Sequence, residues 1–270
     1  MTNTGQMICF DKETGLAYRL RRTNRQEALV FIHGFGSNQE HFRFAFSAPP
    51  LLEFTLLAVD LAGFGASPVP PGFSFTMHDQ ALLVLKLLDT LQIINFHLCG
   101  HSMGGLVVMN MAELAPGRTL SLINLEGNLT PEDCFLSGKV AAMSFTEFTT
   151  HGRKELERGF RLAGMKDPAM RDYAETFAAT NSKALYKSAL HTVQDSALPL
   201  VDKLGRINNS CYIYGDKNRT LFPAEKLLHD NGVPVFYIEN AGHAMALENP
   251  RQLYNTIRQF IDSKHPGLFE

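Results

Sequence analysis

No charge of one sign predominates in this sequence of 270 residues, in which 25 lysine and arginine residues are matched by 27 aspartate and glutamate residues. This balance gives no electrostatic reason to expect nucleic acid or an anionic membrane as a partner. No run of apolar residues approaches the roughly 18 that a membrane-spanning helix needs. Hydrophobic residues make up 45% of the chain, which is enough for the large core of a globular protein.

Cysteine is scarce as well. The four cysteines, Cys9, Cys99, Cys134 and Cys211, follow no paired spacing and form no C-x-x-C motif. This pattern argues against a disulfide framework and is typical of thiols in a reducing compartment. The first residues lack the charged and apolar regions of a secretory signal, so we expect a cytoplasmic protein. No metal-ligand spacing appears, and we expect neither a metal nor an organic cofactor.

Apolar runs of strand length alternate with stretches of helical periodicity along most of the chain. One helix is predicted over Met77–Gln92, with Thr76 as its N-cap, and a closing helix over Glu248–Asp262. The first strands are close enough to pair antiparallel, whereas intervening helices predict a mostly parallel arrangement for the later ones. The predicted strands are Met7–Phe10, Leu16–Leu20, Ala28–Ile32, Thr55–Asp60, Phe96–Cys99, Leu120–Leu125, Cys211–Tyr214 and Val235–Ile238.

One stretch breaks this alternation. Residues 129–198 contain no convincing strand, and we interpret them as a helical cap inserted over the carboxyl edge of the sheet, where α/β proteins bind ligands. Residues 1–128 and 199–270 then form the core. The cap is rich in Phe and Met, of which most are expected to form its own core and a minority to line the pocket. Its predicted helices are Val140–Phe148, Arg153–Leu162, Ala169–Phe177 and Ser182–Thr192.

The sequence Gly100-His101-Ser102-Met103-Gly104 carries the strongest chemical signal, because it has the pattern G-x-S-x-G between a predicted strand and a predicted helix. In that context the motif forms a sharp turn that presents the serine as a nucleophile. The turn requires small residues two before and two after the serine, and Gly100 and Gly104 meet this demand. Ser102 is therefore predicted to be a catalytic nucleophile.

A serine nucleophile needs a base and donors for the oxyanion. His243 follows the last strand and precedes the closing helix, and the chain order of serine first and histidine last is that of hydrolases with this elbow. We therefore predict His243 as the base, and His101 as a residue that packs or lines the pocket wall. The predicted oxyanion donors are the backbone N–H groups of Met103 and of Phe35, which lies in the loop after an early strand. His33, in the same loop, is expected to have a structural hydrogen-bonding role.

These motifs together resemble the α/β-hydrolase superfamily across the whole chain. The matching segments are His33-Gly34-Phe35-Gly36, Asp60-Leu61-Ala62-Gly63-Phe64-Gly65-Ala66-Ser67, Gly100-His101-Ser102-Met103-Gly104-Gly105 and Gly242-His243. The second resembles the D-x-x-G-x-G-x-S turn of the family, whose role there is structural. The resemblance implies an α/β-hydrolase fold, with a mostly parallel eight-stranded sheet flanked by helices and an inserted helical cap.

The acid of the triad is ambiguous in this sequence. Many members of the superfamily carry it in a G-x-x-D turn, but here Gly215-Asp216-Lys217-Asn218 places Asn218 at that position. An asparagine cannot stabilise an imidazolium by charge, and Asp216 could serve only if the turn shifts its register. Some relatives, such as the haloalkane dehalogenases, carry the acid after the strand that follows the elbow, where this chain has Glu126. We favour Glu126 as the residue that orients His243 and keep Asp216 as the alternative.

The expected activity is two-step acyl transfer to water from a carboxylic ester, or a thioester, of a small to medium apolar acyl or aromatic group. Dehalogenases and epoxide hydrolases resemble this fold but use an aspartate nucleophile. Dehalogenases also use tryptophan to hold halide, and this chain has none. Carbon–carbon bond hydrolases commonly have asparagine where His101 stands, which makes them less favoured. Acyl transfer to an alcohol or peroxide shares every catalytic residue. A receptor-like binding protein is the non-enzymatic alternative, and the sequence leaves the oligomeric state open.

Overall fold

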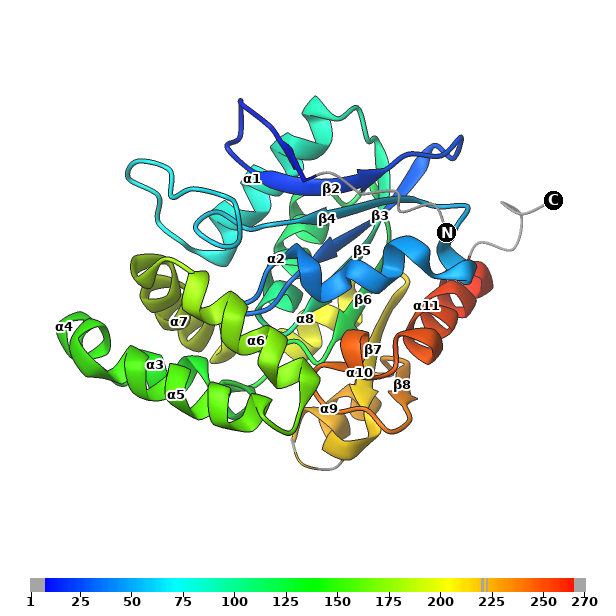
Figure 1. Ribbon diagram of the computed structural model, residues 1–270. Coiled ribbons are helices and arrows are strands. Elements are labelled where there is room, and N and C mark those ends of the chain that lie inside the picture. Colours follow the sequence, from blue (N-terminus) through cyan, green and yellow to red (C-terminus); the bar gives the residue numbers. More distant parts are fainter. Residues whose placement is uncertain (1–7, 220, 222, 265–270) are drawn as a thin grey trace.

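The computed structural model describes residues 8–219, 221 and 223–264, and Figure 1 shows one twisted β-sheet with helices on both sides. The strand order is β1-β2-β4-β3-β5-β6-β7-β8. β2 pairs antiparallel with β1 and β4, and all the other neighbours are parallel. The strands are β1 (Cys9–Phe10), β2 (Ala17–Arg21), β3 (Glu27–Ile32), β4 (Thr55–Val59), β5 (Asn95–His101), β6 (Thr119–Leu125), β7 (Ser210–Gly215) and β8 (Val235–Ile238).

The central strands are apolar along almost their whole length, so the sheet is covered on both faces. One hydrophobic core lies between the sheet and α1 (Met77–Thr90) and α2 (Met103–Leu114). The second lies on the opposite face, against a 3-10 segment η1 (Gln39–Ser47), α10 (Met245–Glu248) and α11 (Pro250–Lys264). With both faces of the described sheet covered, a ligand pocket is expected at the edge where the parallel strands end.

The predicted strands are all present, with ends that differ by at most two residues from the sequence prediction. Met7, the predicted start of the first strand, lies outside the described residues. Thr76 caps α1 as predicted, and its hydroxyl accepts a hydrogen bond from Asp79 N at 3.0 Å. The predicted closing helix Glu248–Asp262 is wrong at its start. Asn249 leaves the helical conformation because Pro250 follows it, and the segment divides into α10 and α11.

The chain between β6 and β7 contains no strand in the described residues. Its helices are α3 (Ser137–Ala141), α4 (Phe145–Glu147), α5 (Arg153–Gly164), α6 (Pro168–Ala179), α7 (Ser182–Ser196) and α8 (Leu200–Arg206), and a π-helical turn over Phe148–Gly152 links α4 to α5. We call α3–α7 the inserted helices; Figure 1 shows them in green, gathered along one edge of the molecule. α9 (Ala224–Asp230) and short 3-10 turns at Pro49–Leu51, Pro131–Asp133 and Asp216–Asn218 complete the helical elements.

The predicted helix over Val140–Phe148 is wrong. Ser144 adopts an extended backbone and accepts a hydrogen bond from Glu147 N at 3.1 Å, so it caps a new helix and ends the preceding one. The other three predicted helices of this segment correspond to α5, α6 and α7. The division into residues 1–128, 129–198 and 199–270 stays a prediction.

Thr76→Ala is expected to lower the free energy of unfolding by about 1 kcal/mol, because it removes the side-chain acceptor at the start of α1. Urea denaturation would measure the change. Thr90→Ala, at the exposed end of the same helix, is the matched control and should change stability by less than about 0.5 kcal/mol. Equal effects of the two substitutions would show that the cap does not stabilise the helix.

Candidate active site

Ser102 joins β5 directly to α2, with backbone angles of φ 52° and ψ −124°. A positive φ is strained for a residue with a side chain and is characteristic of functional turns. A Cβ added to Gly100 would lie 2.4 Å from the Gly104 carbonyl oxygen, and one added to Gly104 would lie 2.3 Å from the carbonyl oxygen of Ile32. Both positions therefore require glycine, and the strand–turn–helix geometry expected from the motif is present.

The loop after β3 lies against this turn. A Cβ on Gly34 would lie 2.9 Å from Ser102 Cβ, so only glycine allows the loop to approach the serine so closely. His33 holds the loop: its Nδ1 donates to the Gly34 carbonyl at 2.8 Å and its Nε2 accepts from Leu61 N at 3.0 Å. The Phe35 N–H follows this anchor, and the Met103 N–H begins α2, where the first N–H groups of a helix have no acceptor within the helix. Both predicted oxyanion donors thus belong to backbone segments that adjoin Ser102.

His243 and Glu126 form a hydrogen-bonded pair. Nδ1 of His243 lies 2.8 Å from Glu126 Oε2, and the side chains are 31% and 4% exposed. The same carboxylate accepts hydrogen bonds from Gly215 N at 2.7 Å and from Asn218 Nδ2 at 2.8 Å. Because a carboxylate only accepts, the His243 proton lies on Nδ1 and Nε2 carries the lone pair that a general base needs.

The structure brings Glu126, and not Asp216, to His243. Asp216 is exposed, its Oδ1 accepts from Ala241 N at 3.2 Å, and within the described residues it makes no hydrogen bond to His243. Asn218 occupies the position where an acid is common, but it is engaged as a donor to Glu126. Sequence reasoning treated Asn218 only as a missing acid, because its partner Glu126 lies 92 positions earlier in the chain.

Two further histidines stand beside His243. His101 Nε2 donates to the His243 carbonyl at 2.8 Å, and its ring lies 4.5 Å from the His243 ring. His41 stacks on the other side of His101 at 4.2 Å between ring centroids and 21° between planes. His101 lines the pocket wall, as expected. His41 was missed, since nothing in the sequence distinguishes it among ten histidines.

Burial keeps the rings of His41 and His101 uncharged. Desolvation, together with the positive charge that His243 can carry, lowers the pKa of His41 to about 3. The same burial, followed by the neighbouring His41 and His243, lowers the pKa of His101 well below its usual range. Within the described residues, His41 Nε2 and His101 Nδ1 have no hydrogen-bond partner. Both rings are therefore neutral at physiological pH.

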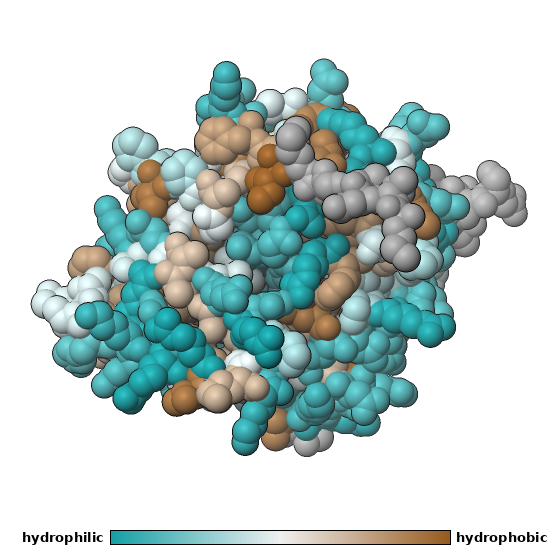
Figure 2. Space-filling model, viewed as in Figure 1, coloured by the Kyte–Doolittle hydropathy of each residue, from teal (hydrophilic) through white to brown (hydrophobic). Residues whose placement is uncertain are grey.

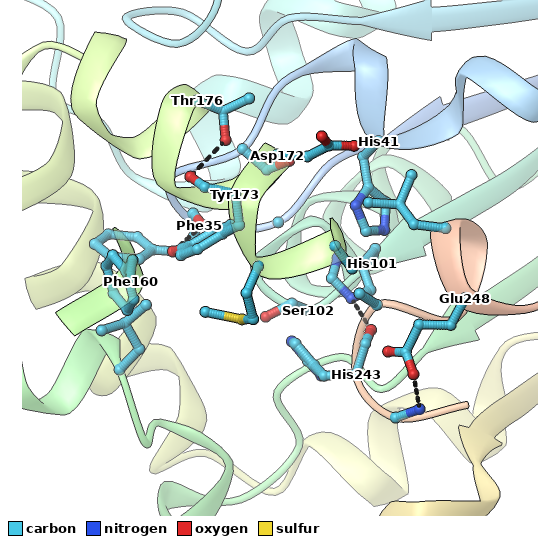
Figure 3. Close-up of a pocket in the computed structure, with 18 of the residues that line it drawn as sticks. Phe35, His41, His101, Ser102, Phe160, Asp172, Tyr173, Thr176, His243 and Glu248 are labelled. Carbon is cyan, nitrogen blue, oxygen red and sulfur yellow. Dashed lines mark hydrogen bonds between the residues drawn. The ribbon is translucent and has the colours of Figure 1, made fainter. Parts of the chain in front are cut away.

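A pocket of about 400 Å³ opens over Ser102, and Figure 3 shows the serine on its floor with His243 and His101 to one side. Phe35, Phe160 and Tyr173 form the opposite wall, while Phe148 and Phe177 are buried in the cores. Ion pairs at the pocket join Arg43 to Asp172 at 2.5 Å and Lys217 to Glu248 at 3.0 Å. No hydrogen bond joins Ser102 to His243 within the described residues; such bonds often tighten only in the substrate complex.

Figure 2 shows hydrophilic side chains over most of one face, with hydrophobic ones in separate small groups. Among residues 8–219, 221 and 223–264, no three His, Cys, Asp or Glu side chains are grouped so that they could hold a metal ion. In that same part of the chain, every helix is too short or too polar to span a membrane.

Comparison with known proteins identifies the family. Residues 29–256 match the sequence model of the alpha/beta hydrolase family. The chain is 42% identical over 253 residues to a dihydrolipoyllysine-residue acetyltransferase component of the acetoin cleaving system of Pseudomonas putida, an alignment that covers 86% of this chain and 63% of that protein. Relatives with this name are longer, and the chain spans 63% and 27% of the length of two of them.

A second relative matches from end to end. The chain is 24% identical to a pimeloyl-[acyl-carrier protein] methyl ester esterase of Aeromonas salmonicida, with 91% of this chain and 100% of that protein covered. Among solved structures, an enol-lactonase from Burkholderia xenovorans LB400 superposes with a TM-score of 0.75 at 21% identity, covering 91% and 96% of the two chains. This likeness concerns the fold, which is the α/β-hydrolase fold that the sequence predicted.

The stability of the protein is expected to fall as the pH drops below 6.5, because the unfolded chain then protonates His41 whereas the folded chain keeps it neutral down to about pH 3. His41→Gln should lower the slope of the unfolding free energy against pH by the equivalent of about one proton taken up on unfolding. Urea midpoints between pH 6.5 and 4 would measure it. The matched control is His78→Gln, at an exposed position of α1, which should leave the slope unchanged. An identical slope in both variants would contradict the neutral state of His41.

Proposed function

Because the chain belongs to the alpha/beta hydrolase family, we propose that it is a serine hydrolase that cleaves a carboxylic ester, or a thioester, of a small to medium apolar acyl or aromatic group. The observation that carries the proposal is the hydrogen bond between His243 and the buried Glu126 in the pocket that holds the strained Ser102. Ser102 is the nucleophile, His243 the base and Glu126 the acid that orients it. Phe35 and Met103 provide the oxyanion N–H groups.

The reaction proceeds in two steps. His243 Nε2 takes the proton of the Ser102 hydroxyl as its oxygen bonds to the acyl carbon, and the two N–H groups stabilise the negative charge on the carbonyl oxygen. The carbon–oxygen or carbon–sulfur bond then breaks, and the leaving alcohol or thiol takes the proton from His243. Water repeats the sequence on the acyl-enzyme and releases the carboxylic acid. Glu126 stabilises the imidazolium that forms in each half-reaction.

The pocket supports this substrate class. A cavity of about 400 Å³ with aromatic walls accommodates an acyl or aromatic group of modest size, and the two cationic side chains Arg43 and Lys217 along it are paired with Asp172 and Glu248. One relative is named as a methyl ester esterase and another as an acetyltransferase component. Both names describe chemistry at an acyl carbon. They favour esters and thioesters over the carbon–carbon bond hydrolases, which His101 already makes less favoured.

Acyl transfer is the second candidate, because the acetyltransferase name belongs to the relative with 42% identity. It uses the same residues, with an alcohol or thiol in place of water. The absence of an acid at Asn218 would favour the receptor-like alternative, but Asn218 donates to Glu126, which supplies the carboxylate at His243 instead. A cytoplasmic location remains a prediction. So does the restriction of partners to small acyl substrates, without nucleic acid.

Ser102→Ala is expected to abolish both ester turnover and the covalent adduct formed with a fluorophosphonate, because the reactive oxygen is removed. In the parent protein, peptide mass spectrometry is expected to locate the adduct on Ser102. Ser47→Ala, at an exposed serine, is the control and should react like the parent protein. Retained turnover in Ser102→Ala, or an adduct elsewhere, would refute the proposal. No adduct on the folded parent protein would favour the receptor-like alternative.

Glu126→Gln is expected to lower kcat by about 10³- to 10⁴-fold, because the neutral amide no longer fixes the tautomer of His243 or stabilises its imidazolium. Asp216→Asn is the matched control, since this carboxylate contacts Ala241 N and not His243. It should change kcat by less than about threefold. Steady-state kinetics on one acyl ester would compare them, and a larger effect of Asp216→Asn would reassign the acid.

A further inference from the structure

A tyrosine from the inserted helices contacts the oxyanion loop. The hydroxyl of Tyr173, on α6, donates to the Phe35 carbonyl oxygen at 3.0 Å, and the two residues are 138 positions apart in the chain. Figure 3 shows Tyr173 reaching from its helix to Phe35 beside the serine. Burial raises the pKa of Tyr173, so its hydroxyl keeps the proton that it donates.

The packing around this hydrogen bond leaves little free space. Gly36 has φ +68°, and a Cβ added there would lie 2.5 Å from Phe177 Cδ2 and 2.8 Å from the Tyr173 hydroxyl. Phe160 packs against both aromatic residues of α6, with ring centroids 5.1 Å from Tyr173 and 5.1 Å from Phe177. α6 therefore rests directly on the loop.

A second link fixes α6 beside the same loop. Arg43, on the η1 segment that follows the loop, forms an ion pair with Asp172 at 2.5 Å. Asp172 immediately precedes Tyr173 in α6. The middle of η1 and the oxyanion loop are thus both tied to the same turn of α6.

The Phe35 carbonyl belongs to the peptide that joins Phe35 to Gly36. The Phe35 N–H belongs to the preceding peptide, so the two groups are connected only through the Phe35 Cα. A displacement of the loop at Phe35 therefore moves its carbonyl and its N–H together, and Gly36 gives the backbone little intrinsic stiffness against it because glycine adopts either sign of φ. The hydrogen bond from the Tyr173 hydroxyl to the carbonyl holds Phe35 in place against that displacement.

We propose that Tyr173 is a positioning residue that fixes the Phe35 N–H toward the oxyanion and so couples the inserted helices to catalysis. The inference rests on the proposed function and deepens it. Tyr173 acts here through Phe35, and its loss should affect the transition state more than the ground state, because the oxyanion forms only as the bond is made.

Tyr173→Phe is the test, since it removes one oxygen and keeps the ring that packs on Phe160. The matched control is Tyr186→Phe, in which another tyrosine of the inserted helices loses a 2.9 Å hydrogen bond to a backbone carbonyl, that of Met143, away from the pocket. Each variant is assayed with an acyl ester and with two ketones that have the same hydrocarbon chain as its acyl group. The Ser102 oxygen adds to the carbonyl carbon of a trifluoromethyl ketone while the serine proton moves to His243, and the resulting O⁻ lies in the oxyanion hole. The plain methyl ketone only fills the pocket.

In Tyr173→Phe, kcat and the affinity for the trifluoromethyl ketone are expected to fall by roughly 10- to 100-fold, while KM and the affinity for the methyl ketone stay within about twofold. Tyr186→Phe should match the parent protein in all four quantities. The ratio of the two ketone affinities does not depend on the fraction of folded protein, so a loss of stability would not mimic the result.

Two outcomes would overturn the inference: an unchanged ratio of the two ketone affinities in Tyr173→Phe, which includes equal weakening of both ketones, or the same change of that ratio in Tyr186→Phe. The failure of the proposed function is distinguishable. In that case the parent protein would neither hydrolyse the ester nor react with a fluorophosphonate, and both proposals would fall together. An active parent protein with an unchanged ratio would remove only the role of Tyr173.

Discussion

The Glu126 carboxylate accepts hydrogen bonds from three points of the chain: the end of β7 at Gly215, the turn at Asn218 and the loop that carries His243. A carboxylate that is 4% exposed is costly to bury unless its oxygens are satisfied, and these donors satisfy both of them. The order of the strands in the sheet makes these contacts possible. β6 and β7 must lie side by side for Glu126 to meet Gly215, and they do so in parallel register.

Ser102 and His243 are tied to this centre by backbone contacts. Ser102 N donates to the Leu125 carbonyl at 3.0 Å, which belongs to the peptide that joins Leu125 to Glu126. His101 closes the arrangement from the other side through its bond to the His243 carbonyl. Glu126 itself has φ 41°, a second strained residue in the same place. Strain at Ser102 and Glu126 persists because the surrounding strands and hydrogen bonds determine both conformations.

The parts that could be predicted from the sequence are those set by local pattern. The strands, the α1 cap and the requirement for glycine at positions 100 and 104 each depend on residues within a few positions of one another. The break before α4 was not predicted, because Ser144 lies within an apolar stretch and was interpreted as part of one continuous helix. Contacts between distant segments left no local trace: Asn218 lies 92 positions from Glu126, and Tyr173 lies 138 from Phe35. The place of His41 at the site was recognised only from the structure, in which its ring stacks on His101.

The segment that carries the inserted helices connects β6 to β7, two neighbouring strands whose ends hold Glu126 and its hydrogen-bond donors. Because the two strands lie side by side, the sheet does not depend on this segment to bring them together. Chimeras that exchange it between relatives would therefore keep the sheet order intact while replacing the part of the pocket wall that includes Phe160 and Tyr173. The contacts of α6 with the loop that carries Phe35 set a limit on such exchange, since a graft without an equivalent of the Tyr173 hydroxyl would lose its hydrogen bond to Phe35. Exchange of this segment is thus restricted where α6 rests on the loop, through Tyr173, Phe177 and the Arg43–Asp172 ion pair, and not at the junctions.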